Sequence, residues 1–148
     1  MKKFVLVMLM LCCSTALFAR NDVPKGWTTN INSALVKAKR EHKQVLVLFT
    51  GSDWCGYCIR LKKDVLDKKQ FQKVAPTKYV LVYFDFPNKK RLPESQRKIQ
   101  SAWASRMGVR GYPCTVILDK DGKKVNMISG YRNAQSYMEA LFPELRHR

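Results

Sequence analysis

Two uninterrupted apolar runs along the chain predict strands that are buried on both faces. They occupy residues 45–49 (Val-Leu-Val-Leu-Phe) and 79–84 (Tyr-Val-Leu-Val-Tyr-Phe). A strand with one face in water alternates apolar and polar residues, so continuous runs indicate the centre of a parallel sheet. A third run, 115–118, precedes the turn sequence Asp-Lys-Asp-Gly at 119–122. That turn predicts a hairpin into an edge strand at 124–128.

Apolar residues at helical spacing separate these runs. We expect a first helix that starts at Asn30 or Asn32, after an irregular lead-in at 20–29. The remaining helices are expected over 55–66, 95–107 and 133–141, with a short helical piece at 70–74 before Pro76. The order of elements predicts an α/β fold with a central mixed sheet, parallel core strands, an antiparallel C-terminal hairpin and helices on both faces. No repeat or boundary interrupts residues 20–148, so we expect one domain there.

Residues 1–19 have the pattern of a secretory signal peptide. Lys2 and Lys3 precede a largely apolar stretch that ends at Ala19, just before Arg20. A spanning helix needs about 20 apolar residues, and this stretch is shorter, so we expect cleavage after Ala19. The predicted location is therefore periplasmic or otherwise exported, where cysteines form disulfides or handle those of other proteins.

The chain is strongly basic, with 28 Lys and Arg residues against 11 Asp and Glu residues and a net charge of +17. Such an excess is typical of proteins that bind nucleic acid or membrane surfaces. Export argues against nucleic acid, so we expect no nucleic-acid partner. Many cations fall on or after the predicted 55–66 helix, at Arg60, Lys62, Lys63, Lys68, Lys69 and Lys73. Most should be solvated, and the rest would favour the Cys55 thiolate and attract acidic protein partners.

The clearest chemical motif is Trp54-Cys55-Gly56-Tyr57-Cys58, where the first buried strand gives way to a helix. Cysteines separated by two residues at a helix start can close a disulfide without distorting the helix. The free N–H groups of the first helical turn favour a thiolate at the first cysteine. Cys55 is therefore the expected nucleophile toward a substrate disulfide, and Cys58 the thiol that resolves the mixed disulfide.

Two other uses of this cysteine pair stay open, a fixed structural disulfide and half of a zinc site. Zinc needs four ligands, usually a second cysteine pair or two closely spaced histidines. The remaining candidates, Cys114, His42 and His147, lack that spacing. We therefore expect redox chemistry, with no bound metal and no cofactor.

Residues 45–58 resemble the active-site segment of thioredoxin-like proteins, and Gly108-Val109-Arg110-Gly111-Tyr112-Pro113 resembles the family's cis-proline loop. The likeness extends over about residues 27–142 and is strongest toward small exported members. It implies a thioredoxin fold and a cis Pro113 that faces the cysteine pair, which leaves the Tyr112 backbone free to pair with an extended substrate segment. Trp54, Gly56 and Tyr57 would shape the site. An ordinary trans turn proline is the alternative for Pro113.

Three departures from the family pattern bear on the chemistry. Cytosolic thioredoxins carry a buried Asp in the first strand, where this chain has Leu48 or Phe49. Tyr57 replaces the proline of Cys-Gly-Pro-Cys, so the motif resembles exported disulfide isomerases and implies a more oxidising pair. Cys114 follows Pro113 where thioredoxins usually carry Thr. Cys114 is either a buried small apolar residue or a third thiol near the site.

The resemblance implies a periplasmic thiol–disulfide oxidoreductase that acts on disulfides of exported proteins, some of them acidic. We expect neither the helical insertion of dedicated oxidases nor the dimerisation domain of dimeric isomerases. We therefore expect a monomeric reductase, with isomerase activity as a further option, supplied by a membrane electron donor. A non-enzymatic binding or chaperone module and a cuprous-ion carrier that uses Cys55, Cys58 and Cys114 are the alternatives.

Overall fold

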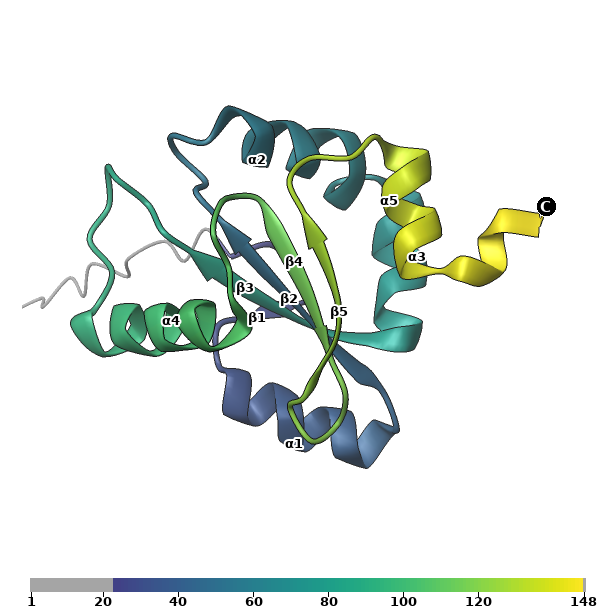
Figure 1. The fold of residues 1–148 in the computed structure, drawn as a ribbon, viewed down its shortest axis with the longest axis horizontal. Coiled ribbons are helices and arrows are strands. Elements are labelled where there is room, and N and C mark those ends of the chain that lie inside the picture. Colours follow the sequence, from purple (N-terminus) through teal and green to yellow (C-terminus); the bar gives the residue numbers. More distant parts are fainter. Residues whose placement is uncertain (1–22, 148) are drawn as a thin grey trace, which may run out of the picture.

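A mixed sheet forms the centre of the protein in a computed structural model that describes residues 23–147 (Figure 1). The predicted signal segment, 1–19, lies outside these residues. The strands are β1 (Trp27–Thr28), β2 (Gln44–Thr50), β3 (Tyr79–Asp85), β4 (Cys114–Leu118) and β5 (Lys124–Ser129). The helices are α1 (Ile31–Glu41), α2 (Gly56–Leu61), α3 (Lys69–Lys78), α4 (Glu94–Met107) and α5 (Ala134–Leu141), with a π-helical turn η1 (Lys62–Leu66) and a 3-10 turn η2 (Pro143–His147). Within the described range, no helix is both long and apolar enough to cross a bilayer.

The five described strands lie in the order β1-β3-β2-β4-β5. β2 pairs in parallel with β3, from Gln44 opposite Tyr79 to Thr50 opposite Asp85. On its other side β2 pairs antiparallel with β4, which continues antiparallel into β5. The predicted α/β class, with parallel core strands and an antiparallel C-terminal hairpin, is confirmed.

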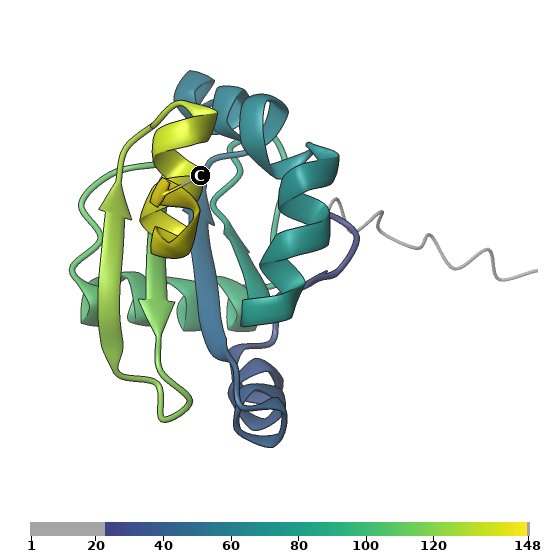
Figure 2. The ribbon, with the colours of Figure 1, turned by 90° about the vertical axis from the view of Figure 1, so that its right-hand side faces the viewer.

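Successive side chains of β2 enter two separate cores, which explains the continuous apolar run. Leu46 and Leu48 pack on one face among residues of α2, α3 and α5. Val45, Val47 and Phe49 pack on the other face among residues of α1 and α4. Figure 2 shows α5 in front of the sheet and α4 behind it. Both faces of β2 are therefore buried. A short loop, residues 51–55, connects the end of β2 to the start of α2.

Local signals place the start of α1 correctly. The Asn30 side chain accepts a hydrogen bond from the Ser33 N–H at 3.0 Å, which makes Asn30 the N-cap. The predicted helix at 55–66 is divided into α2 and η1. Val65 and Leu66 are adjacent residues of η1 and both are buried.

Two expectations about secondary structure are wrong. The lead-in at 20–29 contains the strand β1, which pairs in parallel with β3 because the Trp27 ring packs against Phe71 and Tyr83. The short helical piece expected before Pro76 is a full helix, α3, that includes Pro76 and ends at Lys78. Burial of Phe71 and Ala75 holds this helix on the sheet, so tertiary packing outweighs the local effect of the proline.

Candidate active site

A disulfide between Cys55 and Cys58 lies where β2 ends and α2 begins. Cys55 is the N-cap of α2, and its sulfur accepts a hydrogen bond from the Cys58 N–H at 3.3 Å. The Cys58 sulfur accepts a longer one, at 3.5 Å, from the Gly51 N–H. Both residues are buried, with 8% of Cys55 and 3% of Cys58 exposed.

Trp54 lies over Gly51 beside the disulfide. Its indole Nε1–H donates to the Phe86 carbonyl at 2.7 Å, and the side chain is about half exposed. A Cβ atom built on Gly51 would lie 2.5 Å from Trp54 Cε2, closer than real Cβ contacts come. The indole of Trp54 can therefore pack here because residue 51 has no side chain. The sequence alone indicates only that Gly51 ends a strand.

Two acidic side chains connect this loop to the segment after β3. Asp85, the last residue of β3, accepts hydrogen bonds from the Ser52 N–H at 2.9 Å and the Ser52 hydroxyl at 2.5 Å. Asp53 accepts the N–H groups of Asn88 at 2.9 Å and Lys89 at 2.8 Å. The hydrogen bond from the Asn88 N–H is the largest cause that lowers the pKa of the Asp53 carboxyl. Neither acid was predicted as a site residue, although Asp85 ends β3 and Asp53 follows the adjacent parallel strand β2, which could have suggested it.

The proline loop meets the cysteine segment through aromatic contacts. The Tyr112–Pro113 peptide bond is cis, and Pro113 is buried. The Tyr112 ring packs edge-on against Trp54, with centroids 5.9 Å apart, and stacks on Phe86 at 5.1 Å. Within residues 23–147 the main-chain N–H and C=O of Tyr112 have no hydrogen-bond partner. The structure thus brings together Trp54 and the proline loop, which the sequence separates widely.

A family model described as a thioredoxin-like domain matches residues 31–143. The chain belongs to this thioredoxin-like family. The structure of a protein described as DsbH oxidoreductase superposes with a TM-score of 0.73 at 31% identity, over 82% of this chain and 85% of that one. The fold is therefore the thioredoxin fold, as the sequence motifs predicted.

Two curated relatives come from Chlamydia pneumoniae. The disulfide bond reductase DsbH is 36% identical over 92 residues, 62% of this chain and 55% of that protein. The thioredoxin-related protein DsbJ is 29% identical over 107 residues, 72% of this chain and 31% of that protein. The matched segments span about half and about a third of these relatives' own lengths.

Tyr57, between the two cysteines of this thioredoxin-like site, forms an exposed surface with its neighbours. Its ring is 63% exposed and stacks on Tyr131, with centroids 6.0 Å apart. The Arg60 guanidinium lies 4.8 Å from the Tyr131 ring, and the Tyr131 hydroxyl donates to Asp64 at 2.9 Å. That hydrogen bond is the largest cause that lowers the pKa of Asp64.

Gly56, the other residue between the two cysteines, is exposed, and a Cβ there would meet nothing within 4 Å.

The buried carboxylate of cytosolic thioredoxins has no counterpart in the described residues. Leu48 lies on the sheet face that α2 covers, and the buried polar residues of the range 23–147 are Thr50, Gln100 and Thr115. Thr115 is opposite Leu48 in the sheet and shares a 2.6 Å hydrogen bond with the Tyr137 hydroxyl.

Cys114 lies on the opposite face of the sheet from Leu48. It is the first residue of β4, pairs with Phe49 and packs in the core beneath α1 and α4. Burial is the main reason that the pKa of its thiol is raised. This position fits the first of its two predicted roles, a buried small residue.

The described residues contain no group of three or more His, Cys, Asp or Glu side chains that could hold a metal ion. Cys55, Cys58 and Cys114 are thus not assembled into the trigonal thiol site that the cuprous-carrier alternative needs.

Proposed function

We propose that the protein is a thiol–disulfide oxidoreductase that reduces disulfides of exported proteins through Cys55 and Cys58. The observation that carries this proposal is the disulfide at the start of α2, beside a cis-proline loop with an unpartnered backbone. The likeness to a protein named a disulfide bond reductase supports the direction of reaction. The N-cap position of Cys55, whose sulfur accepts a hydrogen bond from the Cys58 N–H, supports Cys55 as the attacking group.

The reaction starts from the reduced pair. The Cys55 thiolate attacks one sulfur of the substrate disulfide, forms a mixed disulfide and expels one substrate thiolate, which takes up a proton. The Cys58 thiol then loses its proton to water and attacks the Cys55 sulfur. This step forms the Cys55–Cys58 disulfide and expels the second substrate thiolate, which is protonated in turn. Two electrons and two protons pass to the substrate, and the structure corresponds to the oxidised product.

Groups around the pair would position the substrate. The free N–H and C=O of Tyr112 suit an extended substrate segment added as in β-augmentation. Trp54, the residue before Cys55, and Tyr57, two residues after it, provide exposed aromatic surfaces. No step requires a cofactor. A dithiol on a membrane electron-donor protein would return the pair to the reduced state.

The site would work outside the cytoplasm. The basic and apolar pattern of residues 1–19 supports export with cleavage near Ala19. We propose that residues 20–148 then act as a single monomeric domain.

A redox titration of the Cys55–Cys58 pair, combined with an insulin-reduction assay, tests the proposal. We expect turnover with dithiothreitol and a potential between about −270 mV, as in thioredoxin, and about −180 mV, as in protein disulfide isomerase. Cys55→Ser should abolish turnover, whereas Cys58→Ser should accumulate a mixed disulfide that mass spectrometry detects. Cys114→Ser is the matched cysteine control and should keep turnover. A potential near about −120 mV without reduction of insulin would identify an oxidase instead.

A further inference from the structure

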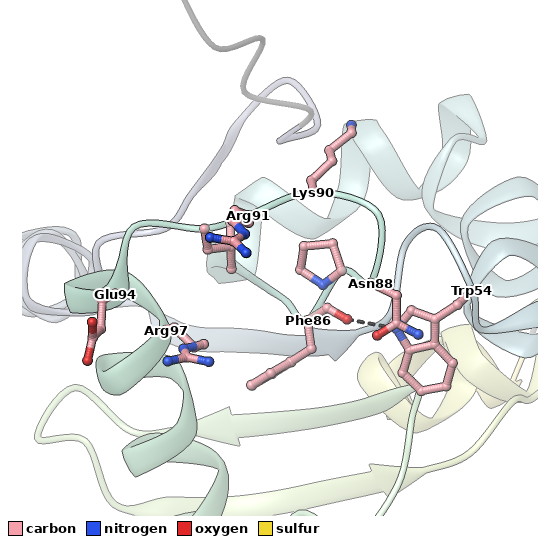
Figure 3. A pocket seen from close by; sticks show the side chains of 9 residues that line it. Trp54, Phe86, Asn88, Lys90, Arg91, Glu94 and Arg97 are labelled. Atoms are coloured by element: carbon pink, nitrogen blue, oxygen red, sulfur yellow. Dashed lines mark hydrogen bonds between the residues drawn. The ribbon is translucent and has the colours of Figure 1, made fainter.

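A cleft of about 720 Å³ extends from Trp54, the residue before Cys55, to the start of α4 (Figure 3). Its apolar lining comes from Trp54, Phe86, Pro87 and Leu92. Trp54 lies at one end in Figure 3, and Glu94 and Arg97 lie at the other. The volume is within the range of about 300–1,000 Å³ that is typical of ligand sites.

The charged lining of the cleft is mainly basic. Lys90, Arg91 and Arg97 contribute to it, against the single acid Glu94. Glu94 forms its ion pair with Lys98, at 3.1 Å. Within residues 23–147, the exposed guanidinium groups of Arg91 and Arg97 form no ion pair and no side-chain hydrogen bond. Guanidinium groups bind carboxylates through two parallel hydrogen bonds, so this end of the cleft is suited to carboxylates.

The cleft is fixed to the redox site by hydrogen bonds. The Phe86 carbonyl accepts the Trp54 indole N–H, and the Asn88 and Lys89 N–H groups donate to Asp53. Each of these bonds joins the segment before Cys55 to the loop that lines the cleft. The loop that lines the cleft therefore has a defined position relative to Cys55.

We propose that this cleft binds an acidic segment of the protein whose disulfide reacts at Cys55, which rests on the proposed reductase function. The unpaired guanidinium groups bind the carboxylates of Asp or Glu residues in that segment. The apolar lining near Trp54 packs against the substrate side chains that lie between those carboxylates and the substrate disulfide. A free inorganic anion would use the arginines alone and leave the apolar end unfilled. The combination favours an extended acidic peptide.

Single-turnover reduction of two disulfide peptides by the pre-reduced protein tests this inference. One peptide carries Glu residues beside the disulfide, and the other carries Gln at the same positions. We expect Arg91→Gln/Arg97→Gln to lower the second-order rate constant for the acidic peptide about fivefold to tenfold. The rate constant for the neutral peptide should change less than about twofold. Because exposed charges are screened, added salt should reduce the preference of the wild type for the acidic peptide.

A charge-matched variant separates the cleft from the overall basicity of the chain. Lys37→Gln/Lys123→Gln removes the same charge from two exposed residues that form no ion pair within the described residues, one on α1 and one in the turn before β5. Both elements lie at the far end of the sheet from α2 (Figure 1). This variant should leave both rate constants within about twofold of wild type. Equal losses in the two double variants, or no preference of the wild type for the acidic peptide, would overturn the cleft as the acidic-segment site.

Fluorescence anisotropy with a labelled acidic peptide, its cysteines replaced by serine, gives a readout that needs no redox chemistry. The inference requires that Arg91→Gln/Arg97→Gln weaken this binding and that Lys37→Gln/Lys123→Gln retain it. If the peptide binds through the cleft but neither peptide is reduced, the reductase proposal is refuted and the binding proposal stands. If both peptides are reduced but binding does not depend on the cleft, the binding proposal is refuted and the reductase proposal stands.

Discussion

A single methyl group on Gly51 should destabilise the active-site loop. In the Gly51→Ala variant the new Cβ would lie 2.5 Å from Trp54 Cε2 and 2.7 Å from both Cζ2 and Nε1. The Gly51 backbone does not have a positive φ, so alanine can adopt its conformation without strain. The effect of the substitution therefore comes from the contact with the indole, which must move away.

The expected loss follows from the contacts that the indole makes. Added atoms in a well-packed site typically destabilise by about 1–3 kcal/mol. Displacement of the indole also breaks its hydrogen bond to the Phe86 carbonyl, which contributes about 0.5–1.5 kcal/mol net. Trp54 is half exposed and can swing toward solvent, which relieves part of the clash. The free energy of unfolding should therefore fall by about 1–3 kcal/mol.

Urea unfolding of the oxidised protein measures this change. Gly56→Ala is the matched control, because a Cβ at Gly56 meets nothing within 4 Å and alanine is favoured over glycine in a helix. That control should be as stable as wild type or slightly more stable. A loss no larger than that of the control would refute the steric reasoning.

A double-mutant cycle with Trp54→Ala tests the cause directly. Without the indole, Gly51→Ala should lower the free energy of unfolding by less than about 0.5 kcal/mol. If the full loss persists in the Trp54→Ala background, the clash with the indole is not its origin.

Two further predictions concern buried groups near the sheet. Tyr137→Phe should lower the free energy of unfolding by about 1–2 kcal/mol, because it leaves the buried Thr115 hydroxyl unpaired. Urea unfolding of Tyr137→Phe/Thr115→Val should recover most of that loss, and a fully additive double variant would contradict the pairing. Burial raises the pKa of the Cys114 thiol, so its contribution to stability is present below the ordinary thiol pKa and is lost as pH rises above it. The decrease in stability from pH 8 to 10, a range around the ordinary thiol pKa of about 8.5, should therefore be smaller in Cys114→Ala, and an equal decrease would contradict this assignment.

The centre of the fold could be predicted because its signals are local. A continuous apolar run such as 45–49 is typical of a strand between two cores, and both cores are present around β2. Asn30 marks the start of α1 because an N-cap acts on the next few residues. The cysteine motif was recognisable for the same reason, since its spacing and its place at a helix start are both contained in a few residues.

The support of the site could not be predicted in the same way, because it depends on contacts between distant residues. Asp85 and Ser52 are 33 residues apart, and only the parallel register of β2 and β3 brings them together. Trp54 and Tyr112 meet through the tertiary fold alone. β1 was missed because a strand of two residues has no periodicity, and its position depends on the ring of Trp27.

The meaning of the high net charge also changes once pairing is considered. The sequence suggested the cations of the cysteine-bearing helix as the ones that attract acidic partners. Arg60 pairs with Asp64 at 3.3 Å and Lys62 with Asp67 at 2.8 Å, so part of that positive charge is neutralised locally. The unpaired guanidinium groups of the cleft instead lie after β3, about 35 residues further along the chain. Because a paired charge attracts a third group weakly, electrostatic selection of substrates should depend on the cleft more than on α2.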